Sequence, residues 1–336
     1  MEFLTEYGLF LAKAVTFLVV VAVILGLIAS AGQKSKPQKI KIEHLNEKLD
    51  HLKKHLQHAV MSKKQLKQLK KAEKKHSKQE SDDEKDKVYV LNFNGDIKAA
   101  QSEQMKDEIS ALLSLGGGIA EIVVKVESGG GMVHQYGFAA SQLERIKQSG
   151  IPLTVCVDKV AASGGYMMAV VADKIIAAPF AILGSIGVIA QLPNFNRLLK
   201  KNDIDFEVHT AGEYKRTLTL FGENTDKARD KFRDDLADVH TLFKDFVSER
   251  RSVVDVTKVA NGDVWYGQKA LEVNLVDEIQ TSDEYLQKRC ESADVYLLSS
   301  EKKKNVMERL GLAAQAGVGK GIEAALQKMA FQKWFV

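Results

Sequence analysis

The chain has 336 residues, of which 45% are hydrophobic and 27% are charged, values that are ordinary for a globular protein. This length allows one large or two modest hydrophobic cores. The net charge of +4 is unevenly distributed, because residues 34–87 hold 17 lysines and 9 acidic residues, a net of +8, which leaves −4 elsewhere. The basic character therefore belongs to one segment and does not indicate a nucleic-acid-binding domain.

Two cysteines, Cys156 and Cys290, are too few and too far apart for a metal site, and we expect both to be free thiols rather than a disulfide. The sequence contains no phosphate-binding loop, no dinucleotide fingerprint and no His-Glu-x-x-His motif. We therefore expect neither a metal nor a cofactor.

Residues 1–33 are predicted to form a transmembrane anchor. The stretch Ala14–Gln33 is twenty residues long, carries no charge and is long enough to cross about 30 Å of hydrocarbon. A cleaved signal peptide is the alternative, since Ala29-Ser30-Ala31 resembles a cleavage site. The acidic Glu2 and Glu6 and the long apolar run favour a retained anchor.

Residues 34–69 are predicted to form a basic amphipathic helix. Its apolar residues recur at spacings of three and four, which is typical of a coiled-coil seam with Lys63 at one seam position; they are Ile42, Leu45, Leu49, Leu52, Leu56, Ala59 and Leu66. A single amphipathic helix that lies on the catalytic domain or on anionic lipid is the alternative. Residues 70–87 have no apolar periodicity and indicate a charged, flexible linker.

Residues 88–295 are predicted to form an α/β domain with a parallel sheet, since short buried strands alternate with helices. The expected strands are Val88–Phe93, Glu121–Val126, Leu153–Val157, Lys174–Ala177 and Phe206–His209, and the expected helices are Ala99–Leu115, Val133–Gln148, Gly164–Ala172, Asn194–Lys201 and Thr225–Arg251. The apolar run Met167–Leu192 is expected to be part of this core rather than a second span, because Asp173, Lys174 and Pro179 interrupt it. Residues 296–336 are expected to be a helical tail.

A candidate nucleophile, Ser163, lies in Val160–Tyr166, between a strand and a helix. Its surroundings, Ala-x-Ser-x-Gly, are close to the nucleophile elbow of serine hydrolases, in which small neighbours let the substrate backbone approach. A Ser-Gly-Gly turn that simply starts a buried helix is the plainer interpretation.

Two further features favour catalysis. Glycines 129–131 follow a strand and precede a helix, so their backbone N–H groups can point into a cleft. Lys215 follows a predicted strand and a turn, 52 residues after Ser163. A lysine can take the proton of a serine hydroxyl if burial lowers its pKa.

These segments together resemble the signal peptide peptidase A family of serine-lysine peptidases, in the ClpP/crotonase clan. The resemblance runs from about residue 88 to about 279 and rests on Glu127–Met132, Asp158–Tyr166, Gly184–Val188 and Gly212–Lys215. It implies a superhelix of repeated ββα units and a bacterial inner-membrane location. Gly129 departs from the family pattern, which usually has proline there. The lysines that follow the predicted anchor would place the domain in the cytoplasm, whereas the family acts outside it, so the side stays open.

The resemblance implies a membrane-anchored serine endopeptidase in which Ser163 attacks a peptide carbonyl and Lys215 acts as general base and acid. The backbone N–H groups of Gly164 and of Gly130 or Gly131 would form the oxyanion hole. A backbone edge at Gly184, Ser185, Ile186 and Gly187 would pair with an extended peptide. We expect signal-peptide remnants or other unfolded or hydrophobic peptides as substrates and a homo-oligomer as the assembly.

Three alternatives stay open. A Ser-His-Asp triad would need His134, His209 or His240 as its base. A crotonase-type enzyme of the same clan would use the glycine N–H groups on an acyl thioester, although no signature for the carrier is present. The third alternative is not an enzyme: it is a catalytically inactive membrane scaffold that the coiled coil holds together.

Overall fold

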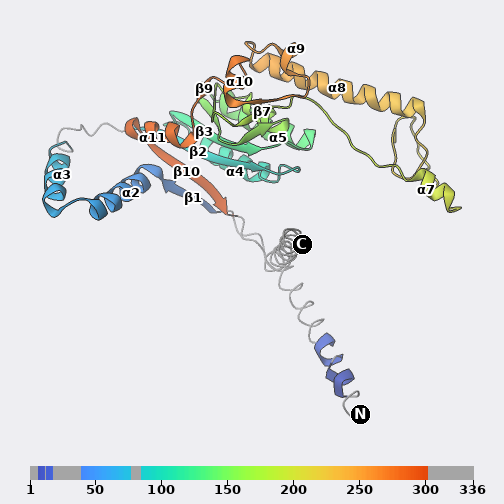
Figure 1. Cartoon of the computed structure of the whole chain (residues 1–336), viewed down its shortest axis with the longest axis horizontal. Helices are drawn as coiled ribbons and strands as arrows, with labels where there is room; N and C mark the ends of the chain where they lie inside the picture. Colours follow the sequence, from blue (N-terminus) through green and yellow to red (C-terminus); the bar gives the residue numbers. More distant parts are fainter. Residues whose placement is uncertain (1–6, 12, 18–38, 77–84, 302–336) are drawn as a thin grey trace, which may run out of the picture. The chain divides into compact units, whose positions relative to one another are not determined.

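The computed structural model describes residues 7–11, 13–17, 39–76 and 85–301 (Figure 1). Residues 41–299 form one compact unit. Outside this unit, residues 7–11 and 13–17 are helical. Among the described residues, no helix combines the length and the apolar character that crossing a bilayer requires. Of the expected anchor, residues 1–6, 12 and 18–33 lie outside the described residues.

The first elements are strand β1 (Lys39–His44) and helices α2 (Leu45–Val60) and α3 (Lys63–His76). The expected continuous helix over residues 34–69 is therefore wrong in two places, because Ile42 lies in a strand and the helix is interrupted after Val60. Ser62 explains the interruption. Its N–H donates to Gln65 Oε1 at 2.9 Å and its Oγ accepts from the N–H of Gln65 at 3.4 Å, a capping box that starts a new helix.

The central sheet has the strand order β1-β10-β2-β3-β4-β6-β9. Parallel pairing joins β10 to β2, β2 to β3, β3 to β4, β4 to β6 and β6 to β9. The strands are β2 (Asp86–Gly95), β3 (Glu121–Ser128), β4 (Leu153–Val157), β6 (Lys174–Ala177), β9 (Glu278–Ile279) and β10 (Ala293–Glu301). β3 and β4 are almost fully buried, which agrees with their near-continuous Val, Ile and Leu content.

The sheet branches at the end of β3. Over Ile122–Lys125, β3 pairs with β4, but its last residue, Ser128, pairs with Ala161 of β5 (Val160–Ala162). β5 in turn pairs in parallel with β7 (Ile182–Gly184), and β7 pairs antiparallel with β8 (Val264–Tyr266). The branch thus brings the end of β3 next to the end of β5, the strand that runs into Ser163.

Helices cover the sheet. α5 (Val133–Gln148) contacts both α4 (Ser102–Leu113) and α6 (Gly164–Ala169). A core of Val88, Val90, Val123, Cys156, Ile176 and Val295 packs against Leu286 of α11 (Ser282–Ser292). The short helices α9 (Val256–Val259) and α10 (Gly267–Glu272) complete the domain.

An arm extends from this body, as Figure 1 shows at the labels α7 and α8. We define the arm as residues 194–239, which include α7 (Asn196–Lys201) and the first part of α8 (Asp226–Arg250). Of all the residues in α8, only Phe243 and Val247, in its second half, are buried. The first part of α8 therefore stands away from the core.

Four of the five predicted strands and all five predicted helices are present, with shifts of a few residues at their ends. Met167–Leu192 is confirmed as part of the core, since it contains the end of α6 together with β6 and β7. The strand expected at Phe206–His209 is wrong, because these residues are exposed in the arm and pair with no described strand. β10 also crosses the expected boundary at residue 295, pairing with β2 as far as Leu297 and Val90.

Candidate active site

Ser163 lies at the junction between β5 and α6, in an unusual backbone conformation with φ of 52° and ψ of −118°. Its N–H donates to the carbonyl oxygen of Gly184 at 2.8 Å, and its own carbonyl accepts from the N–H of Met167 at 2.9 Å. Residues other than glycine rarely adopt a positive φ, which costs about 1–3 kcal/mol. Residues in such conformations cluster at active sites. Ser163 is half-buried, although its neighbours on both sides are buried.

The glycine loop after β3 packs directly on Ser163. Gly130 has a φ of +88°, and a Cβ added to it would come within 2.7 Å of Ser163 Cβ and of the nitrogen of Gly164. No side chain fits at this position. Gly129 differs, because its φ is outside the left-handed region and a Cβ there would meet nothing within 4 Å. Residue 129 thus has room for a side chain, whereas residue 130 has none.

A buried pair of hydroxyl groups, on Tyr136 and Ser128, holds the loop, and neither residue is among those predicted from the sequence. Tyr136 OH donates to the carbonyl oxygen of Asp96 at 2.7 Å and lies 2.5 Å from Ser128 Oγ. Since the Tyr136 proton goes to a carbonyl, which can only accept, the Ser128 hydroxyl donates to Tyr136. Ser128 Oγ then accepts from the N–H of Gly130 at 3.0 Å.

Tyr136 also supports the nucleophile side of the site. It is fully buried, and its ring occupies the space that a Cβ on Gly164 would need. Burial raises the pKa of the Tyr136 phenol, so the hydroxyl keeps its proton. Its position on the apolar stripe of α5, in register with Ala139, Ala140 and Leu143, is the sequence signal that could have identified it.

The candidate oxyanion donors are not equivalent. The N–H of Gly130 is already bonded to Ser128 Oγ. Within the described part of the chain, the N–H groups of Gly131 and Gly164 have no hydrogen-bond partner. Gly164 follows the nucleophile directly and Gly131 is the next residue of the loop that packs on it, so these two groups are the available donors.

The expected substrate edge is shorter than Gly184–Gly187. Gly184 pairs on both sides, with Ala162 of β5 and Val264 of β8, and the N–H of Ser185 donates to Asp263 O at 2.6 Å. Ile186 is fully buried, and Gly187 lies against Gly262. A backbone edge for an extended peptide is therefore left only from Ile186 onward.

Lys215 and Ser163 are not brought together within the chain. Lys215 is exposed in the arm, in a turn where its N–H donates to Gly212 O at 3.2 Å. No hydrogen bond in the described residues joins Lys215 to Ser163. A lysine that acts as a base has to be buried, so the folded single chain does not hold Lys215 in the environment that this role needs.

The histidines offer no replacement base. His134 is exposed in the first turn of α5, and His209 is exposed in the arm, 3.1 Å from Glu207 Oε2. His240 lies in α8, and its Nε2 is buried without a partner among the described residues. None of them is hydrogen-bonded to Ser163 in the described residues, so the geometry does not assemble a Ser-His-Asp triad.

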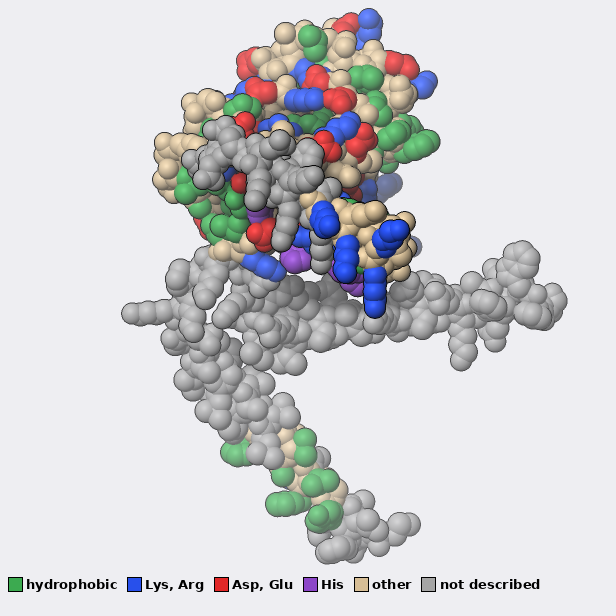
Figure 2. All heavy atoms as spheres, turned by 90° about the vertical axis from the view of Figure 1, so that its left-hand side faces the viewer, with side chains coloured by type: hydrophobic (Ala, Val, Ile, Leu, Met, Phe, Trp, Pro, Cys, Tyr) green, Lys and Arg blue, Asp and Glu red, His purple; other side chains and the backbone are tan. Residues whose placement is uncertain are grey.

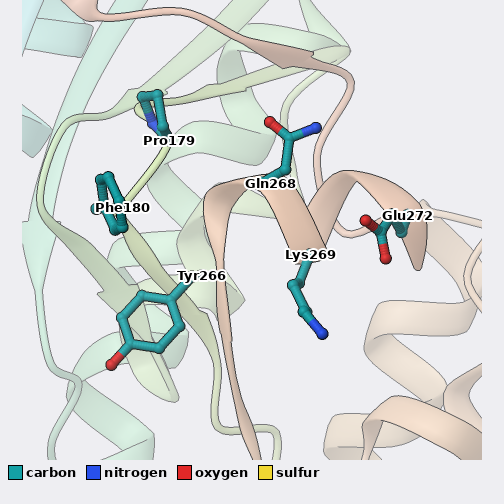
Figure 3. Close-up of a pocket in the computed structure, with 6 residues that line it drawn as sticks. All are labelled: Pro179, Phe180, Tyr266, Gln268, Lys269 and Glu272. Atoms are coloured by element: carbon teal, nitrogen blue, oxygen red, sulfur yellow. The ribbon is translucent and has the colours of Figure 1, made fainter.

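A hollow of about 640 Å³ lies beside β7 and β8. Figure 3 shows the exposed rings of Phe180 and Tyr266 on one side and three side chains of α10 on the other; its lining residues are Pro179, Phe180, Tyr266, Gln268, Lys269 and Glu272. Tyr266 pairs with Ile182 at the start of β7, whereas Ser163 bonds to Gly184 at its end. None of the candidate catalytic residues lines this hollow.

Comparison with solved structures finds similarity to a membrane-bound stomatin-specific protease in complex with a substrate peptide. The match has 15% identity and a TM-score of 0.43, and it covers 67% of this chain and 98% of the other.

Comparison with sequences is more decisive. The chain is 46% identical over 330 residues to the probable protease SohB of Haemophilus influenzae, covering 94% of each chain. It is 47% identical over 337 residues to the probable protease SohB of Buchnera aphidicola from Acyrthosiphon pisum, covering 99% of each chain. Protease 4 of Haemophilus influenzae is 29% identical over 210 residues, which cover 60% of this chain and 34% of that protein.

Family profiles cover almost all of the chain. Residues 145–296 match Peptidase family S49, and residues 2–143 match Peptidase family S49 N-terminal. The strained serine on its glycine loop thus occurs in a chain that matches peptidases over nearly its full length. The chain belongs to peptidase family S49 and is a serine peptidase of the SohB type.

Proposed function

We propose that Ser163 is the nucleophile of this serine peptidase and that Lys215 is its general base. The observation that carries the proposal is the backbone of Ser163, which is held in a strained conformation at the end of β5 and packed against Gly130. Strain of this kind persists only where the surrounding structure enforces it. It exposes the side chain of one residue within an otherwise buried segment.

In the proposed reaction, Ser163 Oγ attacks the carbonyl carbon of a peptide bond while the neutral amine of Lys215 accepts the hydroxyl proton. The N–H groups of Gly131 and Gly164 stabilise the oxyanion of the tetrahedral intermediate. Lys215 then delivers the proton to the leaving amine, which gives an acyl-enzyme. Water, activated by the same lysine, releases the acyl group and restores the serine.

The position of Lys215 supports a dyad that forms between two copies of the chain. The arm carries Lys215 on an exposed turn, and it also exposes large apolar side chains; Leu198, Ile204, Phe206 and Tyr214 are 57%, 51%, 47% and 51% exposed. A second copy that covers this apolar surface would bury the arm. We therefore propose a homo-oligomer in which the arm of one copy supplies Lys215 to Ser163 of its neighbour.

The substrates are proposed to be unfolded or hydrophobic peptides. The free backbone from Ile186 onward suits an extended chain, which a compact folded domain cannot offer. Apolar side chains lie exposed near the glycine loop and beyond the free edge, with Ile97, Met132 and Ile189 at 70%, 42% and 78% exposure. We also propose that the fold is a ClpP/crotonase-like superhelix. A further proposal is an inner-membrane location through a single-pass anchor at Ala14–Gln33, and the uncharged apolar sequence of this stretch supports it.

The test of the dyad uses two variants and their mixture. Ser163→Ala and Lys215→Ala are each expected to abolish peptide hydrolysis, and the double variant should be no worse than either, since residues that act as a unit are not additive. Co-assembly of the two inactive single variants should restore part of the activity if neighbouring copies share a site. Full activity of Lys215→Ala would refute the lysine assignment, and failure of a fluorophosphonate probe to label Ser163 in the active protein would refute the nucleophile.

A further inference from the structure

Helix α2 is fastened to the catalytic unit at its first turn. Leu45 packs against the hydrophobic core. The side-chain amide of Asn46 donates to Cys290 O at 2.9 Å and Ala293 O at 2.8 Å, and Asn46 Oδ1 accepts from the N–H of Val295 at 2.8 Å. These bonds fix the start of α2 relative to α11 and β10, so the rest of the helix has a defined direction on the surface of this unit.

Beyond its first turn, α2 has an apolar stripe that no described residue covers. At about 100° per residue, its apolar side chains fall within an arc of about 100°; they are Leu45, Leu49, Leu52, Leu56, Ala59 and Val60. The exposed fractions of Leu49, Leu52, Leu56 and Val60 are 39%, 56%, 63% and 79%, and α2 contains no buried residue. An exposed stripe of this kind marks a surface that another apolar phase covers.

Two lysines flank this stripe. Lys48 and Lys53 border it on its two sides, whereas Glu47, Asp50 and Lys54 lie toward the opposite face of the helix. Lys48 pairs with Glu43 at 2.8 Å, but both side chains are exposed, so the pair is weak. Lysines beside an apolar stripe can place their stems on the apolar phase and their ammonium groups among anionic headgroups.

The next helix extends the basic surface. Residues 45–76 hold ten lysines and three acidic residues, a net charge of +7. On α3, Lys63, Lys64, Lys67 and Lys71 are exposed. Figure 2 shows lysine and histidine side chains gathered on the face that these helices present.

A second copy of α2 fits this stripe poorly. In a parallel pair built on Leu45, Leu49, Leu52 and Leu56, Lys48 of each helix would face Lys53 of the other, so two like-charged contacts would flank the seam. Lys63 would enter the seam, and the break at Ser62 would end it. Negative charge is what the flanks of this stripe would attract.

We infer that α2, continued by α3, docks on the surface of an anionic lipid bilayer, with Leu49, Leu52 and Leu56 inserted among the acyl chains and Lys48 and Lys53 at the phosphate groups. The attachment of α2 through Asn46 then fixes how the catalytic unit stands on that surface. This inference does not depend on the proposed dyad.

The test uses the full chain with Cys290→Ala, so that a cysteine introduced at Leu52→Cys carries the only reactive label; the remaining Cys156 is buried. An environment-sensitive fluorophore is attached there, and at Lys54→Cys on the opposite face as the matched control. The protein is added to vesicles of phosphatidylcholine alone or of phosphatidylcholine with phosphatidylglycerol, containing lipids brominated in the acyl chains. The proposed anchor at Ala14–Gln33 would attach the chain to both kinds of vesicle, so total binding would not report on α2. Quenching of a label on α2 reports the position of that helix itself.

The label at residue 52 should be quenched in the phosphatidylglycerol vesicles and hardly in the neutral ones, and the label at residue 54 should be quenched in neither. Lys48→Gln and Lys53→Gln should each lower the ratio of docked to undocked helix about fivefold, whereas Lys269→Gln on the catalytic domain should leave it unchanged. Equal quenching in both vesicles, or none, would overturn the inference. A label at residue 52 shielded without vesicles, in proportion to protein concentration, would show that a second copy occupies the stripe.

Discussion

Adjacent glycines in the loop beside Ser163 should respond oppositely to the same substitution. In Gly130→Ala, the new Cβ would lie 2.7 Å from Ser163 Cβ and from the Gly164 nitrogen and 2.8 Å from Ala162 O. Two of these atoms are backbone atoms and the third is the first carbon of the serine side chain, so none can move without shifting the site. The positive φ adds about 1–2 kcal/mol, and the forced displacement adds about 1–3 kcal/mol.

Gly130→Ala should therefore lower the free energy of unfolding by roughly 2–5 kcal/mol, which is a fall in Tm of roughly 4–20 °C for a unit of this size. Its kcat should fall by about 100-fold or more, because the displacement moves the nucleophile and the N–H of Gly164 together. Gly129→Ala meets open space and an ordinary φ. It should raise stability by about 0.4–1 kcal/mol, by restricting the unfolded chain, and leave kcat near that of the parent.

Scanning calorimetry and hydrolysis of a fluorogenic peptide measure both variants side by side. A Gly130→Ala protein with the parent Tm and kcat would refute the close packing of the loop on Ser163. An equal loss in Gly129→Ala would show that the whole loop needs glycine and that its flexibility, rather than the contact at residue 130, is what matters.

Further predictions follow from the buried polar groups. Tyr136→Phe removes the donor to Asp96 O and the acceptor for Ser128, so it should destabilise the protein by about 1–3 kcal/mol in thermal melts and lower kcat while Ser163 remains labelled by a fluorophosphonate. Burial raises the pKa of the Cys156 thiol to about 12. Alkylation at pH 8 followed by mass spectrometry should therefore find Cys156 unmodified in the folded protein and modified on unfolding. Arg251→Ala leaves Asp277 without the guanidinium that bonds both its oxygens and should cost about 2–4 kcal/mol in chemical denaturation, whereas Arg233→Ala, at an exposed pair, should cost less than about 0.5 kcal/mol.

The local pattern of apolar and polar residues was sufficient to predict the strands and helices of the compact unit outside the arm. β4 and β6 occupy the predicted residues because a short, largely buried run between turns has few alternatives. The expected strand Phe206–His209 shows the limit of this reasoning. Its alternation of apolar and polar residues is what a half-buried strand requires, but a strand also needs a partner, and pairing is decided by the whole fold. In the arm no described strand lies alongside it.

In the candidate active site, too, some features could be predicted from local sequence and others depend on the whole fold. Ser163 and the glycines could be predicted because a strained serine and a close backbone approach demand small residues at adjacent positions. The support from Tyr136 and Ser128 could not be predicted, since it depends on the branch of the sheet that brings β3 beside β5. The location of Lys215 depends on how the arm leaves the body, which no spacing in the sequence encodes.

The arm keeps its shape without a core because its stabilisation is local. Thr225 caps α8 by accepting from the N–H of Ala228 at 3.2 Å, and ion pairs one helical turn apart, such as Lys231 with Asp235, follow along the helix. The loop is tied to the same helix by Glu213 and Lys227, which are 2.7 Å apart, and by Lys231 over the ring of Tyr214.

Polar contacts within the arm thus hold the turn that carries Lys215. Phe206 packs on Phe221 within the arm, and the exposed parts of the apolar side chains stay available to another surface. On the proposed dyad, a lone chain would hold a nucleophile without a base. Hydrolysis would then begin only where copies assemble, so the rate per chain should rise with protein concentration until the assembly is complete. A rate per chain that is constant down to the concentration at which light scattering shows a monomer would mean that Ser163 finds its base within its own chain.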